Sequence, residues 1–476
     1  MEQPMVHNYK MFFLHPFIYE DLRHLQILKS LLFHQSQWQL KVYRQGCEAH
    51  RLRTEYFLPH IIKFLFPTMY CKTMEYNKIE QRDIRVLQEL TSLDFSLKES
   101  NLEKYKHFSL KNQDSIYDLT FENINLKIFH GGVGFLFFQV AIHQESLTLN
   151  DIIMVNQLMR PIHPLYQGFS MPVLTFHETL APIAMRDLLE ILLSEIHEVN
   201  GYPNTYNIYM DRLLPYTYVC LKKTSLKNTQ IYQRLDLLEA LRSLNLYNPN
   251  KDSSYVLSHQ EQEKIYYFRH KSSAYGFSKE GGVLLAIDKD SSDEVILPNT
   301  ENAYIPSYFS TYYLDMLILA LYQRISLINY CRKLSMIKSI LNDKNQIERI
   351  RFDILKFTNT AWFTQITNSE LGMGIWKHWF MLFENEVLYG EVKQGLDELD
   401  DFLESKRQNR FSLKLGIVTA LTIPPTLIFG YVGNRFDEIR FIDLIHPRFV
   451  ISSFLIFIGM VGLLFLVDRF YSRPYK

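Results

Sequence analysis

Two long runs without a charged residue near the C-terminus constrain this chain more than any other feature of its sequence. Residues 415–433 and 449–467 contain no Asp, Glu, Lys or Arg. A helix rises ~1.5 Å per residue, so each run is long enough for the ~30 Å hydrocarbon core of a bilayer. The runs predict two transmembrane helices joined by an external loop at 434–448, and a buried hairpin of a soluble core is the less favoured alternative.

The charges around these runs predict how the chain is oriented. The loop at 434–448 carries charges of both signs. By the positive-inside rule, we expect both chain ends in the cytoplasm, including a tail at 468–476, and the protein in the bacterial inner (plasma) membrane. The basic residues outside the runs are Lys406, Arg407, Arg410, Lys414, Arg469, Arg473 and Lys476.

The first run carries small and weakly polar residues at steps of three or four. Such a stripe lies on one face of a helix. It fits either a water-lined pore wall built from several copies or a seam of close helix packing. Pro424 and Pro425 should bend or loosen this helix. The stripe includes Ser412, Gly416, Thr419, Thr426, Gly430 and Gly433.

Residues 370–414 are polar and predict a stalk helix that continues into the first run. A continuous helix from about 384 to 433 would be ~75 Å long. Its acidic residues fit a solvated helix face, or alternatively a metal site that bridges several copies. The candidate metal ligands are Asp397, Asp400, Asp401 and Glu404.

Residues 1–305 predict a cytoplasmic α+β sensor domain with two related halves, and residues 306–369 predict a helical region. Residues 125–142 and 274–288 each contain a Gly-Gly-Val turn that leads into an apolar strand. A helix is expected after the first segment, at 149–159. A ferredoxin-like arrangement would accommodate two such halves.

The first glycine turn is a candidate anion-binding loop. Backbone amides at His130, Gly131, Gly132 and Gly134 could approach a phosphate, although a simple hairpin turn also explains these residues. Arg160 ends the helix that follows, where it could contact an anion or serve only as a helix-terminal charge.

The composition argues against an enzyme and against direct nucleic-acid binding. Lys and Arg total 51 and Asp and Glu total 51, so there is no basic excess to attract nucleic acid. The sequence has no HExxH, GxSxG, CxxC or phosphate-binding lysine motif. Its 4 cysteines are far apart, which indicates neither a disulfide framework nor a zinc site, and no cofactor is expected.

The C-terminal region, from about residue 370 to 476, resembles the CorA magnesium-transporter superfamily. Without gaps, Asn409, Pro424, Thr426, Gly430, Gly433 and Phe436 fall on the family's pattern of Asn, Pro, Thr, Gly and the loop Tyr-Gly-Met-Asn-Phe. The resemblance implies a homopentameric channel whose first span lines the pore, with Mg²⁺ as permeant or structural ion. The pore-lining positions it implies are Asn409, Ser412, Leu415, Thr419, Ile423, Thr426 and Gly430.

The loop motif departs from the family pattern. The family's Gly-Met-Asn aligns with Gly433, Asn434 and Arg435, which Phe436 follows. In this register a permanent cation replaces a neutral oxygen donor, and a ring of arginines would repel Mg²⁺. In a second register, one residue shorter, Asn434 takes the place of the family Asn, and both registers remain open.

A CorA-like end, an altered loop and a large unrelated domain together resemble the CorA-type membrane effectors of type III CRISPR defence. The resemblance implies a channel gated by a small nucleotide second messenger, a conjugate of S-adenosyl methionine and AMP, whose opening harms an infected cell. One alternative is a constitutive divalent-cation (magnesium) transporter. A second is a non-conducting, membrane-tethered binding protein. The expected partners are further copies of this chain, the lipid bilayer and the small nucleotide.

Overall fold

The computed structural model describes most of the chain, which falls into two compact units. The first unit comprises Met1–Ser339 and Asp343–Val392, and the second comprises Ile340–Asn342 and Lys393–Lys476. The described residues are 4–33, 36–71, 81–111, 115–164, 171–177, 181–200, 212–223, 231, 234–245, 265–288, 301–337 and 344–433.

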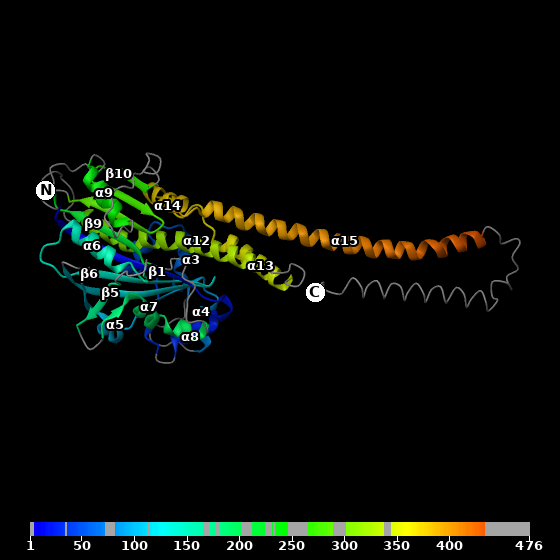
Figure 1. The fold of residues 1–476 in the computed structure, drawn as a ribbon, viewed down its shortest axis with the longest axis horizontal. Coiled ribbons are helices and arrows are strands. Elements are labelled where there is room, and N and C mark those ends of the chain that lie inside the picture. Colours follow the sequence, from blue (N-terminus) through cyan, green and yellow to red (C-terminus); the bar gives the residue numbers. More distant parts are fainter. Residues whose placement is uncertain are drawn as a thin grey trace. The chain divides into compact units, whose positions relative to one another are not determined.

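The first unit is built on one mixed sheet of 12 strands (Figure 1). The strands follow the order β10-β11-β12-β9-β1-β6-β5-β4-β7-β8, and β3 joins β2 to β5 beside this path. Neighbouring strands are antiparallel, except that β9 and β12 run parallel. The strands are β1 (Val6–Ile18), β2 (Trp38–Lys41), β3 (Ser92–Leu97), β4 (His107–Lys111), β5 (Ile116–Phe129), β6 (Val133–Ile142), β7 (Val173–Phe176), β8 (Ile183–Ala184), β9 (Leu214–Leu221), β10 (Tyr266–His270), β11 (Ser273–Ser278) and β12 (Gly281–Ile287).

Helices cover both faces of this sheet. Every residue of β9 and β12 is buried, as expected for strands that pack on both sides. One face packs on apolar residues from α1, α6, α7, α8 and α9. On the other face aromatic rings meet: Phe309 stacks on Tyr216 with centroids 4.1 Å apart, and Tyr322 stacks on Phe129 at 4.3 Å. The helices on the first face are α1 (His24–Leu32), α6 (Leu149–Met159), α7 (Met185–Leu192), α8 (Ser194–Asn200) and α9 (Leu235–Asn245).

Local sequence fixes the start of α6, which coincides with the helix predicted at 149–159. The Thr148 hydroxyl accepts a hydrogen bond from the Asp151 amide at 3.3 Å. The Asp151 carboxylate in turn accepts one from the Thr148 amide at 2.9 Å. This reciprocal capping satisfies two amides that the first helical turn leaves without a partner.

The helical region after the sheet centres on a helix whose first part is fully buried. α11 (Glu301–Tyr308) passes through a π-helical turn at Phe309–Tyr313 into α12 (Leu314–Ser335). Each residue from Leu314 to Gln323 is buried, so this part of α12 is enclosed on all sides. The remaining helices are α2 (Glu48–Thr54), α3 (Pro59–Leu65), η2 (Pro67–Tyr70), η1 (Asp21–Arg23), α4 (Gln81–Gln88), α5 (Glu99–Tyr105), α13 (Lys344–Thr360), α14 (Glu370–Leu382) and α15 (Asn385–Gly433).

The α+β class predicted for the N-terminal portion is confirmed, but the ferredoxin-like arrangement is wrong. Both glycine hairpins are present, as β5–β6 and β11–β12. A ferredoxin-like β-α-β-β-α-β unit has a sheet of four strands, whereas here 12 strands form one sheet, in which β9 and β12, with α9 between them in the chain, are the parallel pair. The two hairpins are therefore parts of one continuous sheet, with β9 and β1 between them.

The polar region from residue 370 forms two helices, because the backbone turns at Glu384. This residue has φ 54°, in the left-handed region that side chains other than glycine rarely adopt. On either side of it, Phe383 and Asn385 are buried, and the Asn385 amide group donates to the Ala320 carbonyl at 3.1 Å. These contacts hold the backbone in this conformation at Glu384, and α15 begins directly after it.

The prediction of two C-terminal transmembrane helices is contradicted by this structure. In the part of the chain that is described, no helix combines the length and the apolar character needed to cross a membrane. Residues 415–433 are the end of α15, a helix of 49 residues. The second predicted span at 449–467, the loop at 434–448 and the tail at 468–476 lie outside the described residues.

Close packing at Gly282 on β12 leads to a testable prediction. A Cβ at this position would lie 2.7 Å from the Trp379 ring and 2.8 Å from the Tyr216 ring. Gly282→Ala should lower the free energy of unfolding by about 1–3 kcal/mol, because a buried core tolerates added volume poorly. Urea denaturation of the purified protein measures this change.

Gly390 provides the matched control on α15. A Cβ there meets nothing within 4 Å. Gly390→Ala should leave stability unchanged or raise it by about 0.5–1 kcal/mol, because alanine favours a helix over glycine. Equal stability losses in the two variants would contradict the packing described at Gly282.

Candidate functional site

The glycine turn predicted to bind an anion is a tight hairpin turn between β5 and β6. Gly132 has φ +78°, and a Cβ there would lie 2.6 Å from the Tyr19 carbonyl oxygen. The Gly132 amide donates to the Phe129 carbonyl at 3.1 Å, and the His130 amide donates to the Thr91 carbonyl at 3.0 Å. These amides hold the turn together, so they are already used. The hairpin interpretation therefore accounts for this glycine.

The side chain of His130 belongs to a group of titratable residues beside the turn. Its Nδ1 lies 3.8 Å from Asp21 Oδ1 and 3.3 Å from Lys356 Nζ. Its ring centroid lies 5.1 Å from that of His24. Four groups thus meet at one end of the sheet: the Asp21 carboxylate from η1, the His24 imidazole from α1, the His130 imidazole from the β5–β6 turn and the Lys356 ammonium group from α13.

Hydrogen bonding fixes His24 in one neutral form. The Tyr19 hydroxyl donates its only proton to the Phe129 carbonyl, so it can only accept from His24 Nδ1, 2.8 Å away. His24 Nε2 is then an acceptor, and it is buried without a hydrogen-bond partner. Burial lowers the pKa of His24 to about 3, and the neighbouring His130 and Lys356 act in the same direction.

Arg160 contacts the second hairpin rather than His130. Its side chain is fully buried, and its guanidinium group lies 3.0 Å from the Glu280 carboxylate, which Arg212 also contacts at 3.1 Å. Glu280 stands in the turn between β11 and β12. Because β9 and β1 separate β12 from β6, the structure divides the predicted ligand residues between two turns at the same end of the sheet.

A row of charges across three strands was missed by the sequence analysis. In the strand register, Lys41 on β2 lies opposite Asp94 on β3, which lies opposite Lys127 on β5. Lys127 Nζ lies 2.7 Å from Asp94 Oδ2, and both side chains are buried. The one available signal was a lysine inside the otherwise apolar run that ends β5.

A second ion pair joins this charge row from the helices above it. Arg53 on α2 lies 3.2 Å from Asp315 on α12, whose side chain is 2% exposed. Burial raises the pKa of Asp315 to about 6, against the opposing effect of Arg53. Burial and the Arg53 charge lower the pKa of Lys41 to about 8. The charge row, defined as Lys41, Arg53, Asp94, Lys127 and Asp315, thus holds three basic and two acidic side chains.

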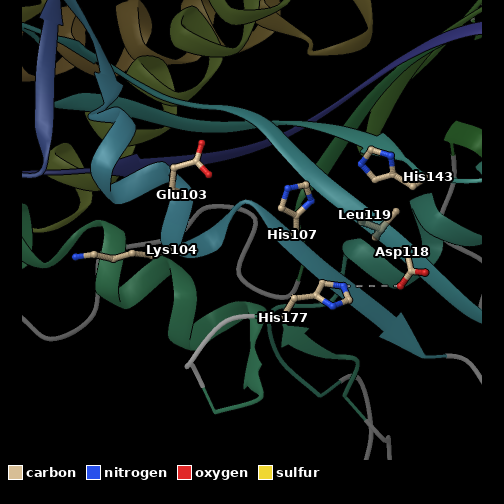
Figure 2. A pocket seen from close by; sticks show the side chains of 7 residues that line it. All are labelled: Glu103, Lys104, His107, Asp118, Leu119, His143 and His177. Atoms are coloured by element: carbon tan, nitrogen blue, oxygen red, sulfur yellow. Dashed lines mark ion pairs between the residues drawn. The ribbon is translucent and has the colours of Figure 1, made fainter.

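A surface cavity of about 410 Å³ is lined by three histidines on the far part of the sheet (Figure 2). The Thr120 hydroxyl links His107 Nδ1, at 3.1 Å, to His143 Nε2. His177 lies 3.9 Å from Asp118, and both of these side chains are more than half exposed. Nowhere in the described ranges do three or more His, Cys, Asp or Glu residues form a group that could hold a metal ion. The cavity is completed by Glu103, Lys104 and Leu119.

The positions predicted from the CorA resemblance lie along α15. Asn409, Ser412, Leu415 and Thr419 are exposed, and the Thr419 hydroxyl donates to the Leu415 carbonyl at 2.8 Å. The acidic residues Asp397, Asp401 and Glu404 are also exposed, and Asp400 is half-buried. Ile423, Thr426, Gly430 and Gly433 belong to the same helix. Asn434, Arg435 and Phe436 lie outside the described residues.

Comparisons with known proteins give no relative for this chain. No protein-family model matches it, and neither a curated protein nor a solved structure matches it significantly.

The buried histidine beside the glycine turn predicts a pH dependence of stability. The pKa of His24 is about 3 in the folded protein and about 6.5 in an unfolded chain. The unfolded chain therefore binds the proton first, and stability falls as the pH drops below about 6.5, by up to about 1.4 kcal/mol per pH unit. His24→Gln, whose amide does not titrate, should reduce this slope by about one proton.

Urea denaturation at several pH values between about 7 and 5 measures the slope, because in this range the folded and unfolded states bind different numbers of protons. His60→Gln is the control, because His60 is exposed. That variant should keep the slope of the unchanged protein. An unchanged slope in His24→Gln would mean that His24 is charged in the folded protein.

Proposed function

We propose that this chain is a CorA-like oligomeric ion channel that a small cytoplasmic nucleotide gates, in the manner of a type III CRISPR antiviral effector. The observation that carries the proposal is α15. Its first turn belongs to the α+β unit, while its later residues carry the CorA-like pattern from Asn409 onward. A ligand-driven change in the first unit would therefore act on the residues of that pattern through one continuous helix.

The start of α15 is held by three contacts within the first unit. Arg324 on α12 donates to the Phe383 carbonyl, and Asn385 donates to the Ala320 carbonyl on the same helix. Glu384 forms an ion pair with Lys279, at 2.7 Å, in the turn of the second hairpin. Any displacement of α12 therefore acts directly on the first residues of α15.

Exposed apolar side chains on α15 support an oligomer. Phe402, Phe411, Leu415 and Val418 are between 39% and 66% exposed. Large apolar side chains of this kind, repeated along one helix, are typical of a surface that another copy or a lipid covers. A pentamer, with Mg²⁺ as a possible permeant ion, follows from the CorA resemblance. The proposed role is binding and conduction, without catalysis.

Ion flux into liposomes tests the proposal directly. The full chain is reconstituted, and entry of Mg²⁺, K⁺ and Cl⁻ is recorded with no ligand, with AMP and with the conjugate of S-adenosyl methionine and AMP. Flux that requires a nucleotide is the expected result. Equal Mg²⁺ flux without any ligand would instead indicate a constitutive magnesium transporter, and an absence of flux would indicate a binding protein that does not conduct.

A variant at the start of α15 tests the mechanical link. Arg324→Ala removes the bond to the Phe383 carbonyl. A hydrogen bond from a charged group contributes about 1.5–3 kcal/mol, so nucleotide-dependent flux should fall about tenfold or more. Nucleotide affinity, measured by calorimetry, should stay within about twofold.

Arg349→Ala is the matched control for this variant. Arg349 lies on α13 with an exposed side chain. Its replacement should change neither flux nor affinity. If Arg324→Ala keeps full gating, α12 does not transmit the signal through this bond.

A further inference from the structure

A second, smaller cavity in the first unit has the chemistry of an anion site. Its volume is about 220 Å³, and it lies between the loop after β2, α2, α3 and η2. Among the described residues that line it there is no Asp or Glu. The lining residues are Arg44, Gln45, Gly46, Cys47, His50, Arg51, Thr54, Ile62, Met69 and Tyr70.

Two guanidinium groups, of Arg44 and Arg51, and the imidazole of His50 line this cavity. Arg51 also pairs with Glu55 at 3.3 Å on the helix surface, where such ion pairs are weak. His50 Nδ1 accepts from the Arg44 amide at 3.1 Å, so its proton stands on Nε2 and that nitrogen is a donor.

The loop that carries Arg44 has a fixed shape. Gly46 has φ +76°, which glycine adopts without strain. A Cβ at this position would meet nothing within 4 Å, so the glycine serves the backbone turn and not close packing. The lining also includes the apolar residues Ile62 and Met69 and the aromatic residue Tyr70. Basic groups together with apolar and aromatic groups in one cavity are the usual requirements of a phosphate ester with a planar ring.

α2 connects this cavity with the charge row. Arg51 and Thr54 line the cavity, while Arg53 of the same helix pairs with Asp315 on α12. The ring of Tyr43 lies 5.1 Å from that of His50, and its hydroxyl accepts from Arg53 at 3.4 Å. α12 then continues to Ala320 and Arg324, which hold the start of α15.

We propose that the cavity beside α2 binds a phosphate-bearing ligand of the nucleoside monophosphate class, and that Arg53 and Asp315 pass its occupancy to α12. The phosphate binds Arg44 and Arg51, and the planar ring lies against Tyr70 and Met69. The pairing of Arg53 with Asp315 depends on the position of α2, which the bound phosphate fixes. The second part of this inference rests on the proposed function, whereas binding itself does not.

Calorimetric titration of the full chain tests the binding step, with AMP, inorganic phosphate and adenosine as separate probes. AMP should bind more tightly than either inorganic phosphate or adenosine. Arg44→Ala combined with Arg51→Ala should weaken AMP at least tenfold, while Arg44→Lys combined with Arg51→Lys should recover part of the affinity. Thermal unfolding confirms that each variant is folded. No AMP binding, or equal binding in the double alanine variant, would overturn the site.

Asp315→Asn tests the transmission step, with Arg349→Ala as its control. The expected result is AMP affinity within about twofold of the unchanged protein, together with loss of nucleotide-dependent flux. Full gating in this variant would overturn the role of the ion pair. If AMP binds at the two arginines but neither the unchanged protein nor any variant conducts ions, the proposed channel is refuted and the site stands. Gated flux that the double alanine variant retains would refute the site and leave the channel intact.

Discussion

Strand β1 is the element on which the first unit depends, because it hydrogen-bonds to both parts of the sheet at once. Residues Met11–Leu14 pair with β6 on one side and with β9 on the other. The first glycine hairpin, β5–β6, is thereby joined to the second, β11–β12, with β9 lying between β12 and β1. Since β1 comes first in the chain and its partner β9 much later, the sheet forms only through pairings that are distant in sequence. Such pairings are slow to form, because the chain loses the entropy of closing a long loop before the strand contacts stabilise it.

The charge row sets the register of the neighbouring strands. Lys127 donates to both the Asp94 carboxylate and the Leu65 carbonyl, so its buried ammonium group is well satisfied. A shift of one residue between β3 and β5 would turn Lys127 to the other face and leave Asp94 without its partner. Removing one member of a buried pair costs about 3–5 kcal/mol, and such a shift would incur a comparable loss. The row therefore excludes alternative pairings that apolar residues alone would tolerate.

Local patterns made some elements predictable from the sequence. The helix expected at 149–159 is α6, and the Gly-Gly-Val turns predict the two hairpins of an α+β domain. The extended helix that begins near residue 384 also follows from sequence, since no proline interrupts it before Pro424. Each of these features depends on residues that are neighbours along the chain.

Features that depend on distant residues were not predictable in the same way. Arg53 and Asp315 meet only because α2 packs beside α12, and neither segment has a sequence feature that indicates the other as its partner. The pairing of strands across one sheet of 12 strands is likewise absent from a hydrophobic pattern, which explains the incorrect ferredoxin-like arrangement. The transmembrane prediction rested on the uncharged runs at 415–433 and 449–467; the first forms the end of α15, and the second lies outside the described residues. The anion cavity combines a loop, two helices and a turn, so no single motif could reveal it.

The left-handed residue at Glu384 has a consequence for the angular position of the residues that follow it in the first unit. Each residue of a helix advances the side chains by about 100°. The anchored residues Phe383 and Asn385 set the starting angle of α15. The direction of Val392, about two turns later, follows from this angle, and its side chain is buried. One residue inserted between Asn385 and Val392 would rotate Val392 to another side of the helix, although Val392 itself would be unchanged.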